Sequence, residues 1–263
     1  MMTRKTVQLD YQDDASIALI QLNRPTALNA LNPQLADDFS SVIGELEGRP
    51  EVRAIIVTGN GKAFCAGGDL AAFKALLDAG ESIGKLAAKF HDSILKIRNM
   101  DTPFIAAING PCFGVGLALA CACDLRLALE SATFSVAFTG VGLSPDSGLP
   151  WFLPHIVGLG VATELALLNP IFDARRAKEI NLLTAMSASD VVADALELAH
   201  QLALMPTKAL GMVKRLYNDC YTNTLTQHLD KQAACVGETA LTEDFQEGCA
   251  AFFEKRKPLF KGK

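Results

Sequence analysis

Short apolar runs alternate with longer stretches of helical periodicity along the first part of the chain. Four runs rich in apolar and β-branched residues predict buried strands, at residues 16–22, 54–57, 103–108 and 124–128. Buried strands that alternate with helices are typical of βα units on a mainly parallel sheet. The pattern therefore predicts an α/β fold.

The first predicted helix follows Asn32, which can cap it, and has Pro33 at its first position. Its apolar stripe consists of Leu35, Phe39, Val42 and Leu46. A second stripe at helical spacing consists of Ile83, Leu86, Phe90, Ile94 and Ile97. Shorter helices are predicted at residues 117–122 and 147–156.

From about residue 160 onward the periodicity is helical, and no strand is predicted there. We expect an α/β core over residues 1–200 and a C-terminal helical region over residues 201–263. The last helix is predicted at residues 242–257, where Lys255 and its two basic neighbours crowd the final turn. Cations at a helix C-terminus suit the helix dipole, and they can also bind phosphate.

Composition excludes several classes of protein. Half of the 263 residues are hydrophobic, so the chain can bury a large core without disulfide or metal staples. A formal net charge of −5 argues against a general nucleic-acid or anionic-membrane binder. No apolar run approaches the ~20 residues of a membrane span. Residues 1–14 carry charges of both signs and no apolar run, so we expect no secretory signal and a cytoplasmic protein.

The cysteines indicate a reducing compartment. They are odd in number and lack the spacing of a zinc site or a disulfide scaffold. The seven are Cys65, Cys112, Cys121, Cys123, Cys220, Cys235 and Cys249. Most lie inside apolar runs, so we interpret them, including the close pair Cys121 and Cys123, as buried structural thiols.

Two glycine-bearing loops, at residues 58–69 and 109–116, each lead from a buried strand toward a helix. Such loops can turn backbone N–H groups into a crevice at the sheet edge. Two converging donors would form an oxyanion hole, and the alternative is that the glycines serve tight turns alone.

Four segments resemble signatures of one enzyme family, in its order and spacing. They are NRPTALNAL at residues 23–31, AFCAGGDL at 63–70, AAINGPCFGVG at 106–116 and AFFEKRKPLFKG at 251–262. They are similar to those of the enoyl-CoA hydratase/isomerase (crotonase) family. The resemblance implies a spiral ββα core, an acyl-CoA thioester substrate, and a homotrimer or dimer of trimers built through the C-terminal helices. It implies no metal and no cofactor besides the coenzyme A carried by the substrate.

The resemblance also assigns site residues. The backbone N–H groups of Gly68 and Val115 match the family's oxyanion hole, which stabilises the enolate of the thioester. Arg24 and Ala66 match positions near the nucleotide of coenzyme A. Phe252 and Lys255 match positions that reach in from the C-terminal helix, in this family often from a neighbouring subunit.

Hydratases of this family hold their water with two glutamates, and neither is present. The matching positions are Ala118 and Phe138, which cannot accept a proton. Addition of water by the usual pair is therefore not expected.

Asp146 is the remaining acidic candidate, and it follows Pro145 just before a predicted helix. One interpretation is an N-cap. The other rests on the LSPDSG…WFLP stretch at residues 143–154, which resembles the acidic segment of Δ3,Δ2-enoyl-CoA isomerases and especially of ring-1,2-epoxyphenylacetyl-CoA isomerases. One carboxylate can move a proton between two carbons of the same substrate, which is what isomerisation needs. We therefore predict an isomerase.

His91 flanks the apolar stripe of its helix, which favours a packing role. Some members of the family that the chain resembles, the 4-chlorobenzoyl-CoA dehalogenases, pair a nucleophilic Asp at the Asp146 position with a His on this helix. The alternatives to an isomerase are thus a hydratase, or a hydrolase or dehalogenase-like enzyme, that uses Asp146, or a non-catalytic binder of CoA thioesters.

Overall fold

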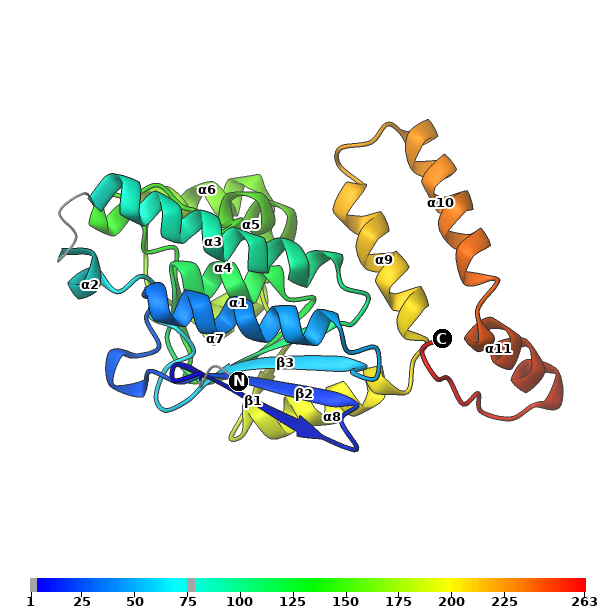
Figure 1. The fold of residues 1–263 in the computed structure, drawn as a ribbon. Helices are drawn as coiled ribbons and strands as arrows, with labels where there is room; N and C mark the ends of the chain where they lie inside the picture. The colour runs from blue at the N-terminus through cyan, green and yellow to red at the C-terminus, as the bar shows by residue number, and fades with distance from the viewer. Residues whose placement is uncertain (1–3, 75–78) are drawn as a thin grey trace.

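The computed structural model describes residues 4–74 and 79–263, and a six-stranded sheet runs through them (Figure 1). The first pair of strands is antiparallel, and every later neighbouring pair is parallel. In spatial order the strands are β1 (Val7–Gln12), β2 (Ile17–Leu22), β3 (Ala54–Gly59), β4 (Phe104–Ile108), β6 (Leu125–Leu129) and β9 (Ala185–Ser187).

Helices cover both faces of this sheet, which is why its central strands are almost wholly apolar. Alternate side chains of a strand point to opposite faces. Ile17 and Leu19 pack with α8 (Val191–Ala203), whereas Ala18 and Ile20 lie in the larger cluster on the other side. The helices of that larger cluster include α1 (Pro33–Glu47), α3 (Ala79–Asn99) and α4 (Val115–Ala122).

A smaller sheet lies beside the start of α4. Its order is β5 (Cys112–Phe113), β7 (Thr133–Ser135) and β8 (Phe172–Asp173). The remaining helices of the core are η1 (Pro25–Ala27), α2 (Leu70–Lys74), η2 (Thr139–Val141), α5 (Leu149–Val157), α6 (Leu159–Leu168) and α7 (Ala174–Glu179).

The structure corrects several of the predicted elements. The prediction of no strand beyond residue 160 is wrong, because β8 and β9 lie there. Each is too short to show an alternating pattern, and long-range pairing alone defines them. The structure adds β1, within the mixed-charge stretch 1–14, whose first three residues lie outside the described residues. The helix expected at residues 147–156 begins only at Leu149.

Three helices form the C-terminal region and lie to one side of the sheet (Figure 1). They are α9 (Thr207–Asp219), α10 (Leu225–Thr239) and α11 (Glu243–Glu254). The expected division at residue 200 falls inside α8, near its end. None of the helices in the described ranges is both long and apolar enough to cross a bilayer.

A buried ion network joins α9 to the core. The Lys214 side chain is 7% exposed, and its Nζ lies 3.0 Å from Asp124 Oδ2. The same Nζ donates to the carbonyl oxygens of Ile97 and Thr102 at 3.0 and 2.9 Å. Arg98 binds the other oxygen of Asp124 at 2.8 Å. Burial lowers the pKa of Lys214, and Asp124 offsets part of that effect.

We expect Lys214→Met to lower the free energy of unfolding by about 3 kcal/mol, because it removes the charge and three contacts from a buried site. Lys208→Met on the same helix is the control. Its side chain is 50% exposed and pairs with Asp101, so its loss should cost below ~1 kcal/mol. Urea unfolding of both variants measures the difference. Equal effects would show that the buried network does not anchor α9.

Candidate active site

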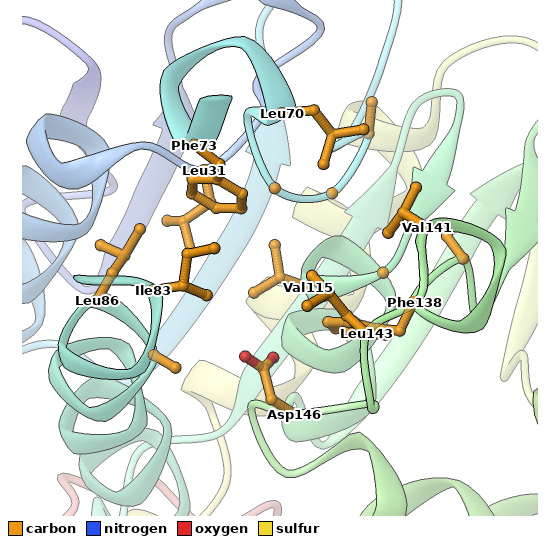
Figure 2. A pocket seen from close by; sticks show the side chains of 16 residues that line it. Leu31, Leu70, Phe73, Ile83, Leu86, Val115, Phe138, Val141, Leu143 and Asp146 are labelled. Carbon is orange, nitrogen blue, oxygen red and sulfur yellow. The ribbon is translucent and has the colours of Figure 1, made fainter. Parts of the chain in front are cut away.

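An apolar pocket of about 100 Å³ lies between α3, the two glycine-bearing loops and the segment before α5 (Figure 2). Its only ionisable side chain, among the residues that the structure describes, is that of Asp146. The lining consists of Leu31, Ala66, Gly67, Gly68, Leu70, Phe73, Ile83, Leu86, Ala87, Gly114, Val115, Ala137, Phe138, Val141, Leu143 and Asp146. The two predicted oxyanion donors and the predicted acid are thus brought into one cavity.

The backbone pairing around Gly68 directs its N–H away from the neighbouring segment. Gly68 forms a parallel bridge with Leu31, and the bonds of this bridge use the Gly67 carbonyl at 2.7 Å and the Asp69 N–H at 2.9 Å. In such a bridge, the residue whose two neighbours make the bonds points its own N–H to the opposite side. Here that residue is Gly68. Because Gly68 lines the pocket, its N–H is available to a ligand there.

Val115 supplies the second N–H because it is the first residue of α4. The first N–H groups of a helix have no partner inside the helix, and they carry the positive end of its dipole. The first bond of α4 runs from the Ala118 N–H to the Gly114 carbonyl, at 3.0 Å. The N–H of Val115 thus remains unused by the helix.

The two loops are held against each other through their backbones. Cys65 and Cys112 form a parallel bridge, and the Phe113 N–H donates to the Cys65 carbonyl at 2.9 Å. Gly116 makes this approach possible, because a Cβ there would lie 2.3 Å from the Cys65 carbonyl oxygen. The relative position of the two donors therefore follows from main-chain contacts.

Asp146 lies at one end of the pocket, and its carboxyl points into the space between α3 and Val115 (Figure 2). The N-cap interpretation is wrong, because Gly148 occupies that position of α5 and no side chain bonds there. The Asp146 Oδ1 atom is buried without a hydrogen-bond partner among the described residues. Burial raises the pKa of Asp146 above its ordinary value, which favours a carboxyl that can hold a proton.

His91 contacts the residue that follows Asp146. The Ser147 N–H donates to His91 Nε2 at 3.2 Å, so this nitrogen acts as the acceptor. Ser147 is buried and has a φ of 53°, a conformation that a non-glycine residue adopts only where its surroundings impose it. His91 thus positions the acidic segment besides packing on α3.

The two positions of the hydratase glutamates are apolar in the structure as well. Phe138 lines the pocket, and Ala118 is fully buried in α4. The pocket therefore contains one carboxyl where the usual water-adding mechanism needs two.

Of the predicted nucleotide contacts, Ala66 lines the pocket and Arg24 lies beside it. Arg24 Nη2 bonds Asp69 Oδ2 at 2.8 Å, and the pair is mostly buried. Because Asp69 follows Gly68 directly, this ion pair also fixes the loop of the oxyanion donor. Arg24 must share its charge between Asp69 and any bound phosphate.

Phe252 and Lys255 do not reach this pocket in the same chain. Phe252 lies on α11 beside a separate apolar cavity of the C-terminal helices. The helix ends at Glu254, and Lys255 is its left-handed C-cap, so the basic residues follow the helix and do not form its last turn as predicted. Arg256 turns back to pair with Glu247 and Glu254. Lys255 and Lys257, the other cations of the predicted cluster, form no ion pair within the part of the chain that the structure describes.

The cysteines stay apart from the pocket chemistry. The prediction of buried thiols is confirmed for Cys65, Cys112, Cys121, Cys123 and Cys235, whereas Cys220 and Cys249 are exposed. Burial raises the pKa of Cys65 to about 11 and that of Cys121 to about 12, so these thiols stay protonated. Within residues 4–74 and 79–263, no three or more His, Cys, Asp or Glu side chains are grouped to hold a metal ion.

A model of the enoyl-CoA hydratase/isomerase family matches residues 12–263. The chain belongs to the enoyl-CoA hydratase/isomerase family. It is 33% identical to 1,2-epoxyphenylacetyl-CoA isomerase of Escherichia coli over 253 residues, which cover 95% of this chain and 97% of that protein. The family acts on acyl-CoA thioesters.

Solved structures of family members share the fold. The crystal structure of an enoyl-CoA hydratase from Polaromonas has a TM-score of 0.91 at 31% identity and covers 97% of this chain and 99% of its own. Enoyl-CoA hydratase from Bacillus anthracis has a TM-score of 0.92 at 29% identity, with 98% and 100% covered. The predicted crotonase-like α/β core with a C-terminal helical region is confirmed. Family members of both names, hydratase and isomerase, resemble the chain.

Sequence reasoning missed the apolar walls of the pocket and the role of Ser147. Leu31 and Phe73 line the pocket from different segments, and Ile83 and Leu86 line it from α3 (Figure 2). Helical spacing identifies the face of α3, but it cannot tell a pocket wall from a core contact. No local signal marks Ser147, because its conformation depends on His91, a residue of another element.

The buried carboxyl leads to a prediction about stability. A carboxyl whose pKa is raised by folding binds its proton more tightly in the folded state. At pH values above this raised pKa, the ionised carboxyl lowers the free energy of unfolding. Asp146→Asn should therefore unfold at the same or a higher temperature than the natural protein at pH 7. The difference should vanish below pH ~3.8, where the carboxyl is neutral in both states. Thermal unfolding across this range tests it, and a marked loss of stability at pH 7 would contradict it.

The predicted oxyanion hole leads to a second prediction about Val115. Proline is well tolerated at the first residue of a helix, so the Val115→Pro variant should fold. The substitution removes the N–H of residue 115, and the proline ring occupies the place of the hydrogen. Loss of one such donor should lower turnover roughly 100-fold or more. Val115→Ala, which keeps the N–H, is the matched control and should lose only a few-fold. Comparable rates in the two variants would show that this N–H does not bind the developing oxyanion.

Proposed function

We propose that the protein is an acyl-CoA isomerase that moves a double bond, or carries out a related aryl or alicyclic isomerisation, through an enolate. The observation that supports this most is a single carboxyl with a raised pKa in an apolar pocket that also presents two free backbone N–H groups. A carboxyl serves both as base and as acid, and the N–H groups bind the enolate oxygen between the two steps.

The proposed reaction has two proton transfers. The Asp146 carboxylate removes a proton from a carbon next to the double bond or the carbonyl, and the electron pair moves onto the thioester oxygen. The N–H groups of Gly68 and Val115 donate to that oxygen and stabilise its charge. The protonated Asp146 then returns the proton to another carbon of the same system, so that the product has the composition of the substrate.

The raised pKa of Asp146 suits this shuttle. A carboxyl of ordinary acidity holds a proton too weakly to keep it between the two transfers, whereas burial strengthens its basicity. The apolar walls also keep water away from the enolate. The proton on Asp146 need not exchange with solvent before it is returned. In that case, part of the product carries the same proton that was removed from the substrate.

Two alternative activities use the same residue. A hydratase would have to activate water with Asp146 alone, because Phe138 and Ala118 replace the usual glutamates. A hydrolase or dehalogenase-like enzyme would attack the acyl group with the Asp146 oxygen. His91, which accepts the N–H of the adjacent Ser147, is the histidine that would assist it. A member that binds CoA thioesters without catalysis is a third alternative.

We further propose that the chain assembles as a homotrimer or a dimer of trimers in which α11 completes the coenzyme A site of a neighbour. Phe252 and Lys255 lie away from the pocket of their own chain, which fits a site between subunits. Large apolar side chains of α10, α11 and their connection are more than half exposed in the single chain, and such surfaces favour association. They include Leu225, Leu229, Val236, Leu241, Phe245, Phe252 and Phe253.

Asp146→Asn is the test of the isomerase. The variant should fold, bind acyl-CoA, and lose most isomerisation of a 3-enoyl-CoA thioester. Exchange of the α-proton in heavy water should be lost with it, because both need the carboxylate. Retention of α-proton exchange at the natural rate would sink the proton-shuttle proposal.

Labelled water separates the alternatives in the natural enzyme. Oxygen-18 that enters the Asp146 carboxyl during turnover would identify a nucleophile in place of a base. Oxygen-18 that enters a hydroxyl of the product would identify a hydratase. An isomerase incorporates the label in neither place, and mass spectrometry of the protein and of the product distinguishes the three results.

A further inference from the structure

The chain after α11 turns back along that helix. Lys255, the C-cap, has a φ of 56°, and Figure 1 shows the chain returning from the end of α11 toward the start of α9. We call residues 256–263 the return segment. The N–H of Leu259 in this segment donates to Glu247 Oε1 of α11 at 2.7 Å. The segment therefore runs beside α11 in the opposite direction.

Asp244, in the first turn of α11, holds the far part of the return segment. Its two carboxyl oxygens accept the N–H groups of Lys261 and Gly262 at 2.6 and 2.7 Å. The N–H of Asp244 donates to the Lys263 carbonyl at 3.1 Å. Asp244 is 3% exposed, and Thr242 supplies the cap of the helix. The carboxylate of Asp244 thus binds the return segment and is not needed to cap α11.

The return segment meets the core at Arg53. This residue directly precedes β3 and is 8% exposed, and its Nη2 donates to the Met205 carbonyl at 2.6 Å. Its Nε donates to the hydroxyl of Thr207, the first residue of α9. A Cβ on Gly262, which has a φ of +77°, would lie 2.7 Å from Arg53 Nε. Burial lowers the pKa of Arg53, and the charge of Asp244 offsets part of this effect, so the core, α9, α11 and the return segment share one junction.

Apolar packing does little to place α11 within a single chain. Its buried residues are Asp244 and Ala251, whereas Phe245, Phe252 and Phe253 are more than half exposed. No other helix or strand of the described ranges packs extensively on α11. The polar junction therefore sets the direction of this helix relative to the core.

We propose that Asp244 is a positioning residue for the coenzyme A site. By binding the return segment against Arg53, it directs α11 so that Lys255 meets the nucleotide of a thioester bound to a neighbouring subunit. The proposal rests on the proposed function, in which α11 completes that site. Lys255 lies about 16 Å along the helix from Asp244, so a small change of angle at the junction is amplified there. A helix fixed before the ligand arrives also loses less entropy on binding.

A double-mutant cycle with free coenzyme A tests this coupling in the intact protein. Asp244→Ala and Lys255→Ala should each weaken the binding of coenzyme A about 10-fold, as measured by calorimetry. The double variant should also lose only about 10-fold, because Asp244 acts through Lys255, whereas independent residues would lose about 100-fold together. Losses that multiply, or an unchanged affinity in Asp244→Ala, would overturn the proposal.

Glu243→Ala is the matched control for Asp244→Ala. It removes the same charge from the same turn, but the Glu243 side chain is 66% exposed and its cationic partner, Lys261 Nζ, lies 3.9 Å away. The affinity for coenzyme A should change by less than about 2-fold. A loss equal to that of Asp244→Ala would attribute the effect to charge at the start of α11 and would contradict the positioning role.

Gly262→Ala tests the junction without altering α11. Glycine alone adopts this φ beside Arg53 without strain, so the added Cβ should displace the return segment. The variant should weaken coenzyme A binding in the natural background and have no further effect in Lys255→Ala. This second cycle decides the question if Asp244→Ala does not fold. Equal losses in both backgrounds would count against the proposal.

These measurements separate the proposal from the proposed function on which it rests. Undiminished affinity in Lys255→Ala would show that α11 does not complete the coenzyme A site, and it would remove the role of Asp244 as well. A weakened Lys255→Ala variant whose loss multiplies with that of Asp244→Ala would keep the site and remove the positioning role alone. No turnover is measured, so the result does not depend on the chemistry of Asp146.

Discussion

The backbone contact between the two glycine-bearing loops is the constraint on which the site depends. The bridge of Cys65 with Cys112 brings one strand-to-helix loop against the other, and Gly116 allows the approach. From this contact the N–H groups of Gly68 and Val115 face one cavity from different segments. Because these N–H groups belong to the main chain, side chains around them can vary while the proposed oxyanion hole persists.

Asp146 differs from these donors, because it lies in the pocket through its side chain, and burial of the carboxyl costs stability. Its Oδ1 atom is buried without a partner among the described residues, and its pKa is raised by burial. The bond from Ser147 to His91 and the positive φ of Ser147 hold the segment in this position. An unpartnered carboxylate is disfavoured in a folded protein unless the site uses it. The proposed shuttle requires that property, since only a basic carboxyl can hold the proton between two carbons.

The long helix α3 connects these features. One of its faces packs on α1, and another lines the pocket that contains Asp146. Near its C-terminal end Arg98 joins the buried network of Asp124 and Lys214, which holds α9 against the core. The network thus links the helix that lines the pocket to the C-terminal region.

The sequence by itself determined the features that depend on local pattern. The apolar runs predicted the central strands, because residues buried on both faces cannot alternate with polar ones. Glycines at two strand ends indicated the donor loops, and apolar residues at positions 118 and 138 excluded the glutamate pair.

The tertiary structure alone decided what depends on distant partners. Asp146 is a pocket residue and not a cap because Gly148 begins α5, and β9 exists only because β6 offers it an edge. Arg24 is bound to Asp69, and Ser147 to His91, through contacts between residues 45 and 56 positions apart in the chain. Such pairings leave no periodic signal, since their energy arises only when separate elements meet.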